Sequence, residues 1–278
     1  MTDRYAVVGN PIAHSKSPEI HDAFARATGH DLTYERLLAP LDGFVATVEA
    51  FAREGGLGAN VTVPFKLEAF ALARERSARA DKAGACNTLA RRGDHWYGDN
   101  TDGVGVVRDL THNLGVALGG RDLLVLGAGG ATRGILGPLL AEKPRSLVIA
   151  NRTLERAALL ATMFAADGPI RAAGVDAGGA QRFDVVIEAT SAALAQLAAT
   201  DATAALPWPT TIFARDALAY DLKYAAQPTP FLRWASAHGA GRSIDGLGML
   251  IEQAAESFAI WRGVRPPTAP VFAMLRPS

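Results

Sequence analysis

Hydrophobic positions along the chain alternate between short, β-branched runs and longer runs with helical spacing. This alternation is typical of repeated βα units that build parallel sheets. The short runs predict strands and the longer runs predict helices. The expected strands are 5–8, 59–63, 123–126, 146–150, 184–187 and 217–221, and the expected helices include 18–28, 43–53 and 154–164.

The first predicted helix carries clear start and stop signals. Ser17 is expected to cap its N-terminus, with Pro18 and Glu19 in the first turn, and Gly29 is expected to end it. The alanine-rich segment 192–206 is compositionally simple, and the sequence leaves it as either a helix or a loop.

A chain of 278 residues suits two domains. The pattern places a boundary after Asp102, before a helical run over 103–114. A last helical run covers 246–261 and contains Phe258 and Trp261. We therefore expect an α/β protein built from two α/β domains.

The charge balance argues against nucleic-acid and membrane-surface binding, because 28 Lys and Arg face 28 Asp and Glu and leave no basic excess. The single cysteine, Cys86, forms no internal disulfide, which suits a reducing cytoplasm. The apolar run at 5–8 is too short for a signal peptide, and no run approaches the roughly 20 residues of a membrane span. We expect a cytoplasmic protein.

A glycine-rich turn follows the predicted strand 123–126. It reads Gly127-Ala128-Gly129-Gly130-Ala131-Thr132, with Thr132 at the third glycine position of the dinucleotide fingerprint. Glycines at a strand-to-helix turn let the backbone approach a pyrophosphate, whose charge then lies at the helix N-terminus. A glycine-rich turn without a ligand is the alternative interpretation.

The end of the next predicted strand indicates which cofactor is preferred. NAD sites place an Asp or Glu about 20 residues after the glycines, to bind the ribose 2′-hydroxyl. This chain has Asn151, Arg152 and Thr153 there, with Arg156 one turn later. Guanidinium groups match a 2′-phosphate, so the sequence predicts NADP rather than NAD. Helix capping by Thr153 and solvation of Arg156 are compatible with this role.

Two charged residues follow predicted strands and are candidates for proton transfer. Lys66 lies beyond strand 59–63, and Asp102 lies at the proposed domain junction. A lysine beside a carboxylate can act as a general acid or base. The alternatives are a surface lysine and a helix-capping aspartate. No histidine, acid or cysteine spacing indicates a metal site.

Eight sequence blocks, in order over nearly the whole chain, resemble the shikimate dehydrogenase family. They cover 10–18, 60–66, 84–89, 100–103, 127–131, 151–153, 220–224 and 246–255. The resemblance implies reversible, NADPH-dependent reduction of 3-dehydroshikimate to shikimate in aromatic amino-acid biosynthesis. It also implies a mostly parallel substrate domain at 1–102 and 246–278, a Rossmann NADP domain at 103–245, and a C-terminal helix that returns to the substrate domain. The implied assembly is a monomer or a homodimer.

The resemblance assigns roles to matching positions. Lys66 and Asp102 become the catalytic pair. The implied substrate-binding residues are Ser15, Ser17, Thr62, Asn87, Tyr224 and Gln253. The implied NADP-binding residues are Gly127, Ala128, Gly129, Gly130, Ala131, Asn151, Arg152, Thr153, Arg156, Thr190, Leu222 and Gly246.

Three positions depart from the family pattern, which commonly has an amide where this chain has Glu188, a glycine where it has Ala193 and an aliphatic residue where it has Cys86. Cys86 is expected to act as a small buried hydrophobe. A charge and a lost glycine change the loop expected near the cofactor. Two alternatives stay open at this point. One is a relative that accepts quinate or uses NAD. The other is an NADP-binding regulatory module without turnover.

Overall fold

The computed structural model describes residues 2–176, 179–190 and 206–276. The chain divides into two compact units: unit 1, Met1–Gly105 with Leu250–Ser278, and unit 2, Val106–Met249. The sequence predicts limits after 102 and before 246, whereas the two units divide after Gly105 and before Leu250. The alanine-rich segment lies outside the described residues apart from Leu206.

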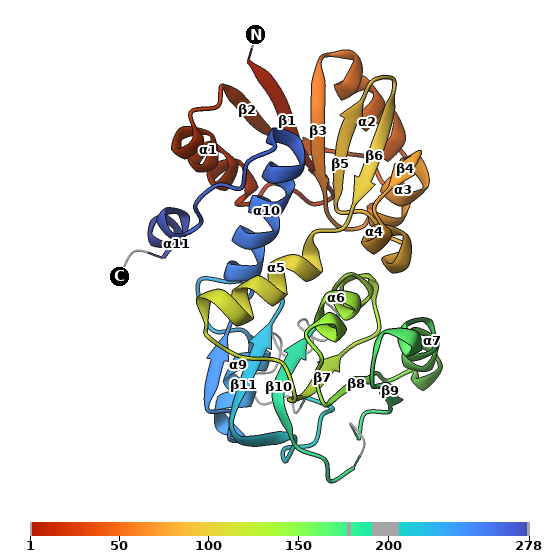
Figure 1. The fold of residues 1–278 in the computed structure, drawn as a ribbon, viewed down its shortest axis with the longest axis vertical. Helices are drawn as coiled ribbons and strands as arrows, with labels where there is room; N and C mark the ends of the chain where they lie inside the picture. Colours follow the sequence, from red (N-terminus) through yellow and green to blue (C-terminus); the bar gives the residue numbers. More distant parts are fainter. Residues whose placement is uncertain (1, 177–178, 191–205, 277–278) are drawn as a thin grey trace. The chain divides into compact units, whose positions relative to one another are not determined.

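Unit 1 contains one six-stranded mixed sheet with helices on both faces (Figure 1). Its strands are β1 (Asp3–Gly9), β2 (Leu32–Leu38), β3 (Gly56–Val61), β4 (Glu75–Arg76), β5 (Thr88–Arg92) and β6 (His95–Asp99). Its helices are α1 (Ser17–Thr28), α2 (Phe44–Arg53), α3 (Lys66–Leu72), α4 (Ala78–Ala83), the start of α5 (Asp102–Arg108), most of α10 (Leu247–Arg262) and α11 (Ala269–Leu275).

The strand order of this sheet is β2-β1-β3-β5-β6-β4. β1, β2 and β3 are parallel, as βα units require, but β5 runs antiparallel to both β3 and β6. The sequence reading missed this β5–β6 hairpin, because Arg91 and Arg92 interrupt its apolar pattern. The expectation of parallel βα units is therefore wrong for this part of the sheet.

The two faces of the unit 1 sheet pack against different helices. On one face, Val8, Val61 and Leu89 form a buried cluster with Phe44 and Val48 of α2. On the other face, aromatic residues of α1 and α10 pack together and against the sheet. Trp261 of α10 stacks on Tyr5 of β1, with 4.7 Å between the ring centroids. Gly58 permits this packing, since a Cβ there would lie 2.5 Å from Trp261 Nε1.

Unit 2 contains a six-stranded sheet in which every pair is parallel. Its strands are β7 (Asp122–Leu126), β8 (Ser146–Ala150), β9 (Ile170–Ala173), β10 (Phe183–Glu188), β11 (Phe213–Asp221) and β12 (Arg242–Ile244). Its described helices are η1 (Asp109–Asn113), which continues α5, then α6 (Gly130–Ala141), α7 (Leu154–Phe164), η2 (Ala165–Asp167) and α9 (Pro230–Ala237).

The unit 2 strand order, β12-β11-β10-β7-β8-β9, is the doubly wound dinucleotide-binding order. Counting β7 as the first strand, it reads 3-2-1-4-5-6 from β9 to β12. The order reverses between β7 and β10, and ligands of such sheets bind at the carboxyl ends of the strands at this point. In a sheet of this order we therefore expect a ligand beside Leu126 and Glu188, where these two strands end.

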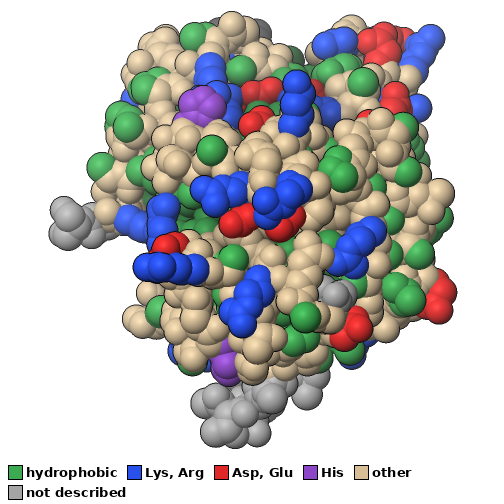
Figure 2. Space-filling view, turned by 60° about the horizontal axis from the view of Figure 1, so that its bottom comes forward, with side chains coloured by type: hydrophobic (Ala, Val, Ile, Leu, Met, Phe, Trp, Pro, Cys, Tyr) green, Lys and Arg blue, Asp and Glu red, His purple; other side chains and the backbone are tan. Residues whose placement is uncertain are grey.

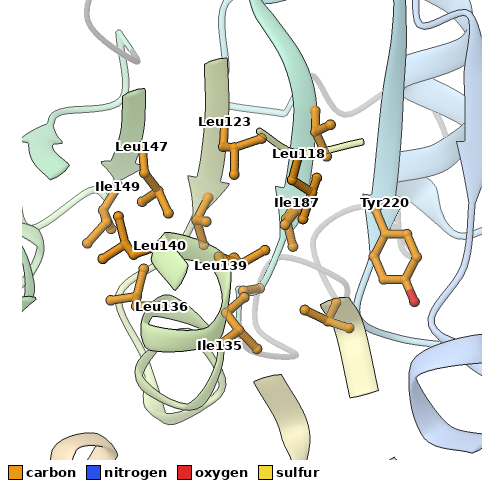
Figure 3. Close-up of a cluster of buried hydrophobic side chains, with 14 of the residues drawn as sticks. Leu118, Leu123, Ile135, Leu136, Leu139, Leu140, Leu147, Ile149, Ile187 and Tyr220 are labelled. Atoms are coloured by element: carbon orange, nitrogen blue, oxygen red, sulfur yellow. The ribbon is translucent and has the colours of Figure 1, made fainter. Parts of the chain in front are cut away.

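Alternating side chains of the buried strands explain the two layers of helices around this sheet. Leu123 and Leu147 face a cluster with Ile135 and Leu139 of α6, and Figure 3 shows these side chains pointing toward one another. The next residue along β7, Leu124, belongs to the opposite cluster with α9. This period of two follows from strand geometry, and burial of both faces explains the continuous apolar runs in the sequence.

The first helix begins differently from the prediction. Lys16 occupies the N-cap position of α1 and Ser17 is already helical, so the prediction that Ser17 caps the helix is wrong. The reason is that Ser15 supplies the oxygen: its Oγ accepts a hydrogen bond from the Ser17 backbone N–H at 3.3 Å. The predicted stop is confirmed, since Gly29 has φ 69° and its N–H bonds to Ala25 O.

Figure 2 shows Lys and Arg side chains gathered across the middle of one face, with Asp and Glu side chains between them. Within the described part of the chain, no helix is both long enough and apolar enough to cross a bilayer.

Candidate active site and cofactor site

Lys66 and Asp102 form an ion pair in unit 1. Lys66 is the first residue of α3 and Asp102 the first residue of α5. The Lys66 Nζ lies 2.6 Å from Asp102 Oδ2, and the two side chains are 21% and 7% exposed. The predicted helix starting at 103 therefore begins one residue earlier, with the Asp102 carboxylate turned to the lysine.

Asn87 holds the second oxygen of this carboxylate. Its Nδ2 donates to Asp102 Oδ1 at 2.8 Å and lies 3.2 Å from Gln253 Oε1. Asn87 and Gln253 are almost fully buried, so their amide groups are held in place by these bonds. Lys66, Asp102, Asn87 and Gln253 thus gather at one site, although α10 contributes Gln253 from far along the chain.

The serine pair lies at the start of α1. Ser15 Oγ donates to Ser17 Oγ at 3.1 Å. Burial raises the pKa of Tyr34 well above its ordinary value, and a hydrogen bond with Ser17 acts in the opposite direction. Tyr34 also donates to Asn60 Oδ1 at 2.8 Å, so the serine pair joins the polar residues of β3.

Thr62 lies just after β3 and is half-buried. Its backbone N–H bonds to Val8 O at 3.0 Å, which ties it to the end of β1. Gly9 leaves room for it, because a Cβ on Gly9 would lie 2.4 Å from Thr62 Cγ2. The carboxyl ends of β1 and β3 therefore bring Thr62 beside the loop that carries Ser15.

Sequence reasoning missed several members of this polar group. Asn60, Thr88, Thr101 and Ser257 are buried and hydrogen-bonded to the predicted residues or to one another. Thr88 and Thr101 directly neighbour predicted residues, and Ser257 lies one helical turn after Gln253. Their sequence positions, next to predicted site residues or one helical turn away from one, were the only indication that they belong to the site.

The glycine-rich turn of unit 2 has the geometry of a phosphate-binding loop. Gly127 has φ 103°, and a Cβ there would lie 3.1 Å from the backbone of Ala189 and Thr190. Among the residues that the structure describes, a Cβ on Gly129 or Gly130 would meet nothing within 4 Å, so these residues leave this side of the turn open. α6 begins at Gly130, and its free N–H groups suit a pyrophosphate.

Thr132, at the third glycine position, is fully buried. Its hydroxyl donates to Gly127 O at 2.9 Å, which ties the first turn of α6 to the loop. The threonine therefore stabilises the turn from inside and leaves its open side free.

The arginines predicted to contact a 2′-phosphate are exposed at the end of β8. Arg152 and Thr153 lie in the short loop before α7, and Arg156 lies in its first turn. Thr153 is the N-cap residue without a capping bond from its side chain. Asn151 shapes this loop, since its Nδ2 donates to Thr153 O at 2.8 Å. The residues that we expect to bind the 2′-phosphate thus lie together.

Leu222 and Gly246 meet at the same edge of the sheet. Leu222 N–H bonds to Glu188 O at 3.0 Å. Gly246 lies against it, since a Cβ there would lie 2.3 Å from Leu222 O. The glycine at 246 is therefore required by close backbone contact, and these residues lie at the carboxyl end of β10.

Glu188 and Asp221 are neighbouring buried carboxyl groups. They pair in register at the ends of β10 and β11 and are 5% and 2% exposed. Burial raises the pKa of Glu188 to about 7, while hydrogen bonds from the Thr190 hydroxyl and N–H act against this shift. Burial also raises the pKa of Asp221, and bonds from Thr229 and the Lys223 N–H oppose it.

These two carboxyl groups border a pocket in unit 2. Its lining also includes Thr190, Lys223 and Tyr224. Tyr224, predicted to lie near the substrate carboxylate, is half-buried there and belongs to unit 2. Glu188 stands where the family commonly has an amide. Because burial raises its pKa to about 7, its carboxyl group can be uncharged there, as an amide is.

Cys86 is a buried free thiol whose pKa burial raises to about 12. It packs behind Gly98, where a Cβ would lie 2.6 Å from the sulfur. This agrees with a role as a small buried hydrophobe. Among the residues that the structure describes, no group of three or more His, Cys, Asp or Glu side chains could hold a metal ion.

The doubly wound sheet with its glycine turn, together with a lysine–carboxylate pair among polar amides, defines the class of nicotinamide-dependent oxidoreductases. Family models match most of the chain. They are described as shikimate dehydrogenase substrate binding domain (residues 7–89), shikimate / quinate 5-dehydrogenase (residues 109–214) and shikimate 5'-dehydrogenase C-terminal domain (residues 246–271).

Full-length relatives point to the same family. A protein of Alkalilimnicola ehrlichii named shikimate dehydrogenase (NADP(+)) is 56% identical over 278 residues, covering 100% of both chains. The chain belongs to the shikimate dehydrogenase family.

Solved structures have the same fold. The Ael1 enzyme of Pseudomonas putida has a TM-score of 0.90 and 46% identity, over 100% of this chain and 99% of that one. A shikimate 5-dehydrogenase of Thermus thermophilus, in complex with NADP(H) and shikimate, has a TM-score of 0.81 and 32% identity, over 96% of both chains.

Proposed function

We propose that this chain catalyses the reversible, NADPH-dependent reduction of 3-dehydroshikimate to shikimate. The observation that carries the proposal is the Lys66–Asp102 pair at 2.6 Å, with Asn87 on the second carboxylate oxygen. Relatives about 55% identical over the whole chain are named NADP-dependent shikimate dehydrogenases. A binding module without turnover has no need of a proton-transfer pair.

The substrate is a small anion rich in hydroxyl groups, and it offers little apolar surface to bury. Recognition must therefore come from directed donors and acceptors. Ser15 and Ser17 bind its carboxylate in our proposal, and Tyr224 lies near it. Thr62, Asn87 and Gln253 hold the ring hydroxyls. An analogue that lacks one hydroxyl would leave a buried partner unpaired, so such a site discriminates strongly.

NADPH, when bound, supplies the hydride that reduces the substrate carbonyl carbon. Reduction also requires one proton on the carbonyl oxygen, and Lys66 Nζ donates it. In the reverse direction Lys66 accepts the proton of the alcohol. Asp102 holds the lysine through Oδ2 and orients a substrate hydroxyl.

The cofactor would be held by the glycine turn 127–131, by Asn151, Arg152, Thr153 and Arg156, and by Thr190, Leu222 and Gly246. The open side of Gly129 and Gly130 leaves room for the pyrophosphate at the start of α6. Arg152 and Arg156 offer positive charge where an NAD site has an acid, and this favours NADP.

One spectrophotometric panel tests the proposal: purified chain with shikimate or quinate, against NADP⁺ or NAD⁺. We expect strong activity with shikimate and NADP⁺. A preference for quinate with NAD⁺ would instead indicate the quinate-accepting alternative. No activity in any of the four combinations would indicate an NADP-binding module without turnover.

We also propose that the chain acts in the cytoplasm, which its one free, buried cysteine supports. We expect a monomer or a homodimer without nucleic-acid or membrane partners. Light scattering after size exclusion measures the assembly, and a larger oligomer would contradict this expectation.

A further inference from the structure

Buried hydroxyl and amide groups continue behind Asn87, away from Lys66. Thr88 Oγ1 lies 2.9 Å from Asn87 Oδ1, and Ser257 Oγ lies 2.8 Å from Thr88 Oγ1. Asn60 Nδ2 lies 2.9 Å from Ser257 Oγ. Thr88 and Ser257 are 1% and 0% exposed, so protein groups must satisfy their hydrogen bonds.

The Asn87 amide has one possible orientation. The backbone N–H of Thr101 lies 2.8 Å from the Asn87 side chain, and an N–H can only donate. The atom facing it must therefore be Oδ1. The Asn87 Nδ2 then faces Asp102 Oδ1, and it donates a hydrogen bond to the carboxylate.

The direction of the next bonds follows from this orientation. Asn87 Oδ1 can only accept, so the Thr88 hydroxyl donates its single hydrogen to it. Thr88 Oγ1 is then left to accept, and Ser257 Oγ is the nearest hydroxyl, at 2.8 Å. Ser257 in turn accepts from Asn60 Nδ2 at 2.9 Å.

The chain of donors begins at an aromatic hydroxyl. Tyr34 donates to Asn60 Oδ1 at 2.8 Å, and it is stacked on His21 with ring centroids 4.2 Å apart. The bonds from Tyr34 to Asn60, from Asn60 to Ser257, from Thr88 to Asn87 and from Asn87 to Asp102 all donate in the same direction. Bonds aligned in this way polarise and strengthen one another at low local dielectric. The Ser257 hydroxyl hydrogen has two acceptors within reach, Thr88 Oγ1 at 2.8 Å and Gln253 O at 3.0 Å.

We propose that Thr88 and Ser257 are positioning residues for the catalytic pair, acting through the Asn87 amide. The Thr101 N–H fixes which way this amide faces, the Thr88 hydroxyl adds a second donor to Asn87 Oδ1, and Ser257 holds the Thr88 hydroxyl in place. The amide in turn holds the carboxylate that binds Lys66. Neither hydroxyl belongs to the residues proposed to contact the substrate. The inference rests on the proposed function, and it adds residues that support the reaction from outside the binding site.

Thr88→Val tests the inference, because valine keeps the shape of threonine and removes the hydroxyl. Asn87 Oδ1 then loses one donor, and its amide and the Asp102 carboxylate gain freedom to shift. We expect kcat for shikimate oxidation to fall about tenfold, the equivalent of one buried hydrogen bond, with KM for NADP⁺ within about twofold of wild type. Thr88→Ser, which keeps the hydroxyl, should restore most of kcat.

Thr47→Val is the matched control. Its hydroxyl bonds to Gly43 O at the start of the same helix, α2, so its loss should leave kcat unchanged. Ser257→Ala removes the next hydroxyl and should lower kcat in the same direction as Thr88→Val. It carries the test if Thr88→Val fails to fold.

Wild-type kcat in a folded Thr88→Val, or an equal loss in Thr88→Ser, would overturn the positioning role alone. Both results would leave the proposed function standing. If the wild-type chain oxidises no shikimate with NADP⁺, the proposed function fails and the positioning role fails with it.

Discussion

Lys66 Nζ donates to Asp102 Oδ2 across 2.6 Å, although 36 residues separate them in the chain. Each residue begins a helix: α3 follows β3, and α5 follows β6. β3 and β6 run in the same direction, because β5 is antiparallel to both, so the two helices begin at the same edge of the unit 1 sheet. Both side chains are mainly shielded from water. Partial burial strengthens their attraction and restricts their motion, and a proton-transfer pair benefits from both.

Lys66→Ala should lower kcat for shikimate oxidation by at least about a hundredfold, since it removes the proposed proton-transfer group. KM for shikimate should change far less, because the binding hydroxyls and amides remain. Steady-state kinetics measures both constants. Lys82→Ala, at an exposed position of α4, is the control and should keep wild-type kcat. Near-normal turnover in Lys66→Ala would show that the assigned role is wrong.

Glu188 should make the folded chain less stable as pH rises toward neutrality. Its pKa is raised from 4.5 to about 7, so the folded state retains a proton that the unfolded state releases earlier. The stabilisation is complete below about pH 4.5 and is lost as pH rises through 7. By the free energy per pKa unit, the loss is on the order of 3 kcal/mol.

Glu188→Gln removes this proton uptake while it preserves the shape of the side chain. Urea unfolding of both proteins between pH 4.5 and 8 measures the effect. The difference in unfolding free energy, variant minus wild type, should rise with pH and level off above about pH 8. A pH-independent difference would contradict a titration of Glu188 in this range.

His21 should have the opposite dependence on pH. It is fully buried, and burial lowers its pKa from 6.5 to about 3. The folded state holds it neutral, so its contribution is complete above about pH 6.5 and is lost as pH falls toward 3. His21→Phe should therefore flatten the acid side of the stability curve, by roughly 4 kcal/mol at pH 3.

Thermal or urea unfolding from pH 3 to 7 checks this expectation. His112→Phe, at an exposed position, is the control and should keep the wild-type pH dependence. If His21→Phe loses stability on acidification as steeply as wild type, His21 is not responsible for the acid response.

Arg152→Ala combined with Arg156→Ala should reduce the preference for NADP⁺ over NAD⁺. Each guanidinium group is exposed beside the end of β8, where a 2′-phosphate would be recognised. We expect kcat/KM for NADP⁺ to fall about 10- to 100-fold, while kcat/KM for NAD⁺ changes much less. The ratio of the two constants is the measurement.

Arg233→Ala is the control for this double variant. Arg233 is exposed on α9 and bonds to Pro228 O. Its loss should leave the cofactor ratio unchanged. A wild-type ratio in the double variant would rule out recognition of the 2′-phosphate by these arginines.

The elements with strong periodicity, and the chemistry of the motifs, could be predicted from the sequence. Strand 146–150 and helix 154–164 occur at the predicted residues. Buried strands of a parallel sheet are apolar on both faces and amphipathic helices repeat at 3.6 residues, so both patterns are visible locally. The glycine turn and the arginines after the next strand could also be recognised, because each directly follows a strand with such a pattern.

Which distant residues meet could not be predicted and is seen in the folded chain. The β5–β6 hairpin, the polar chain through Thr88 and Ser257, and the close approach of Gly248 to Asp109 have no local pattern. A Cβ on Gly248 would lie 2.1 Å from the Asp109 carboxylate, a contact made between residues on different helices. Such contacts depend on side-chain packing and on hydrogen bonds between segments far apart in the chain, and spacing along the sequence does not encode them.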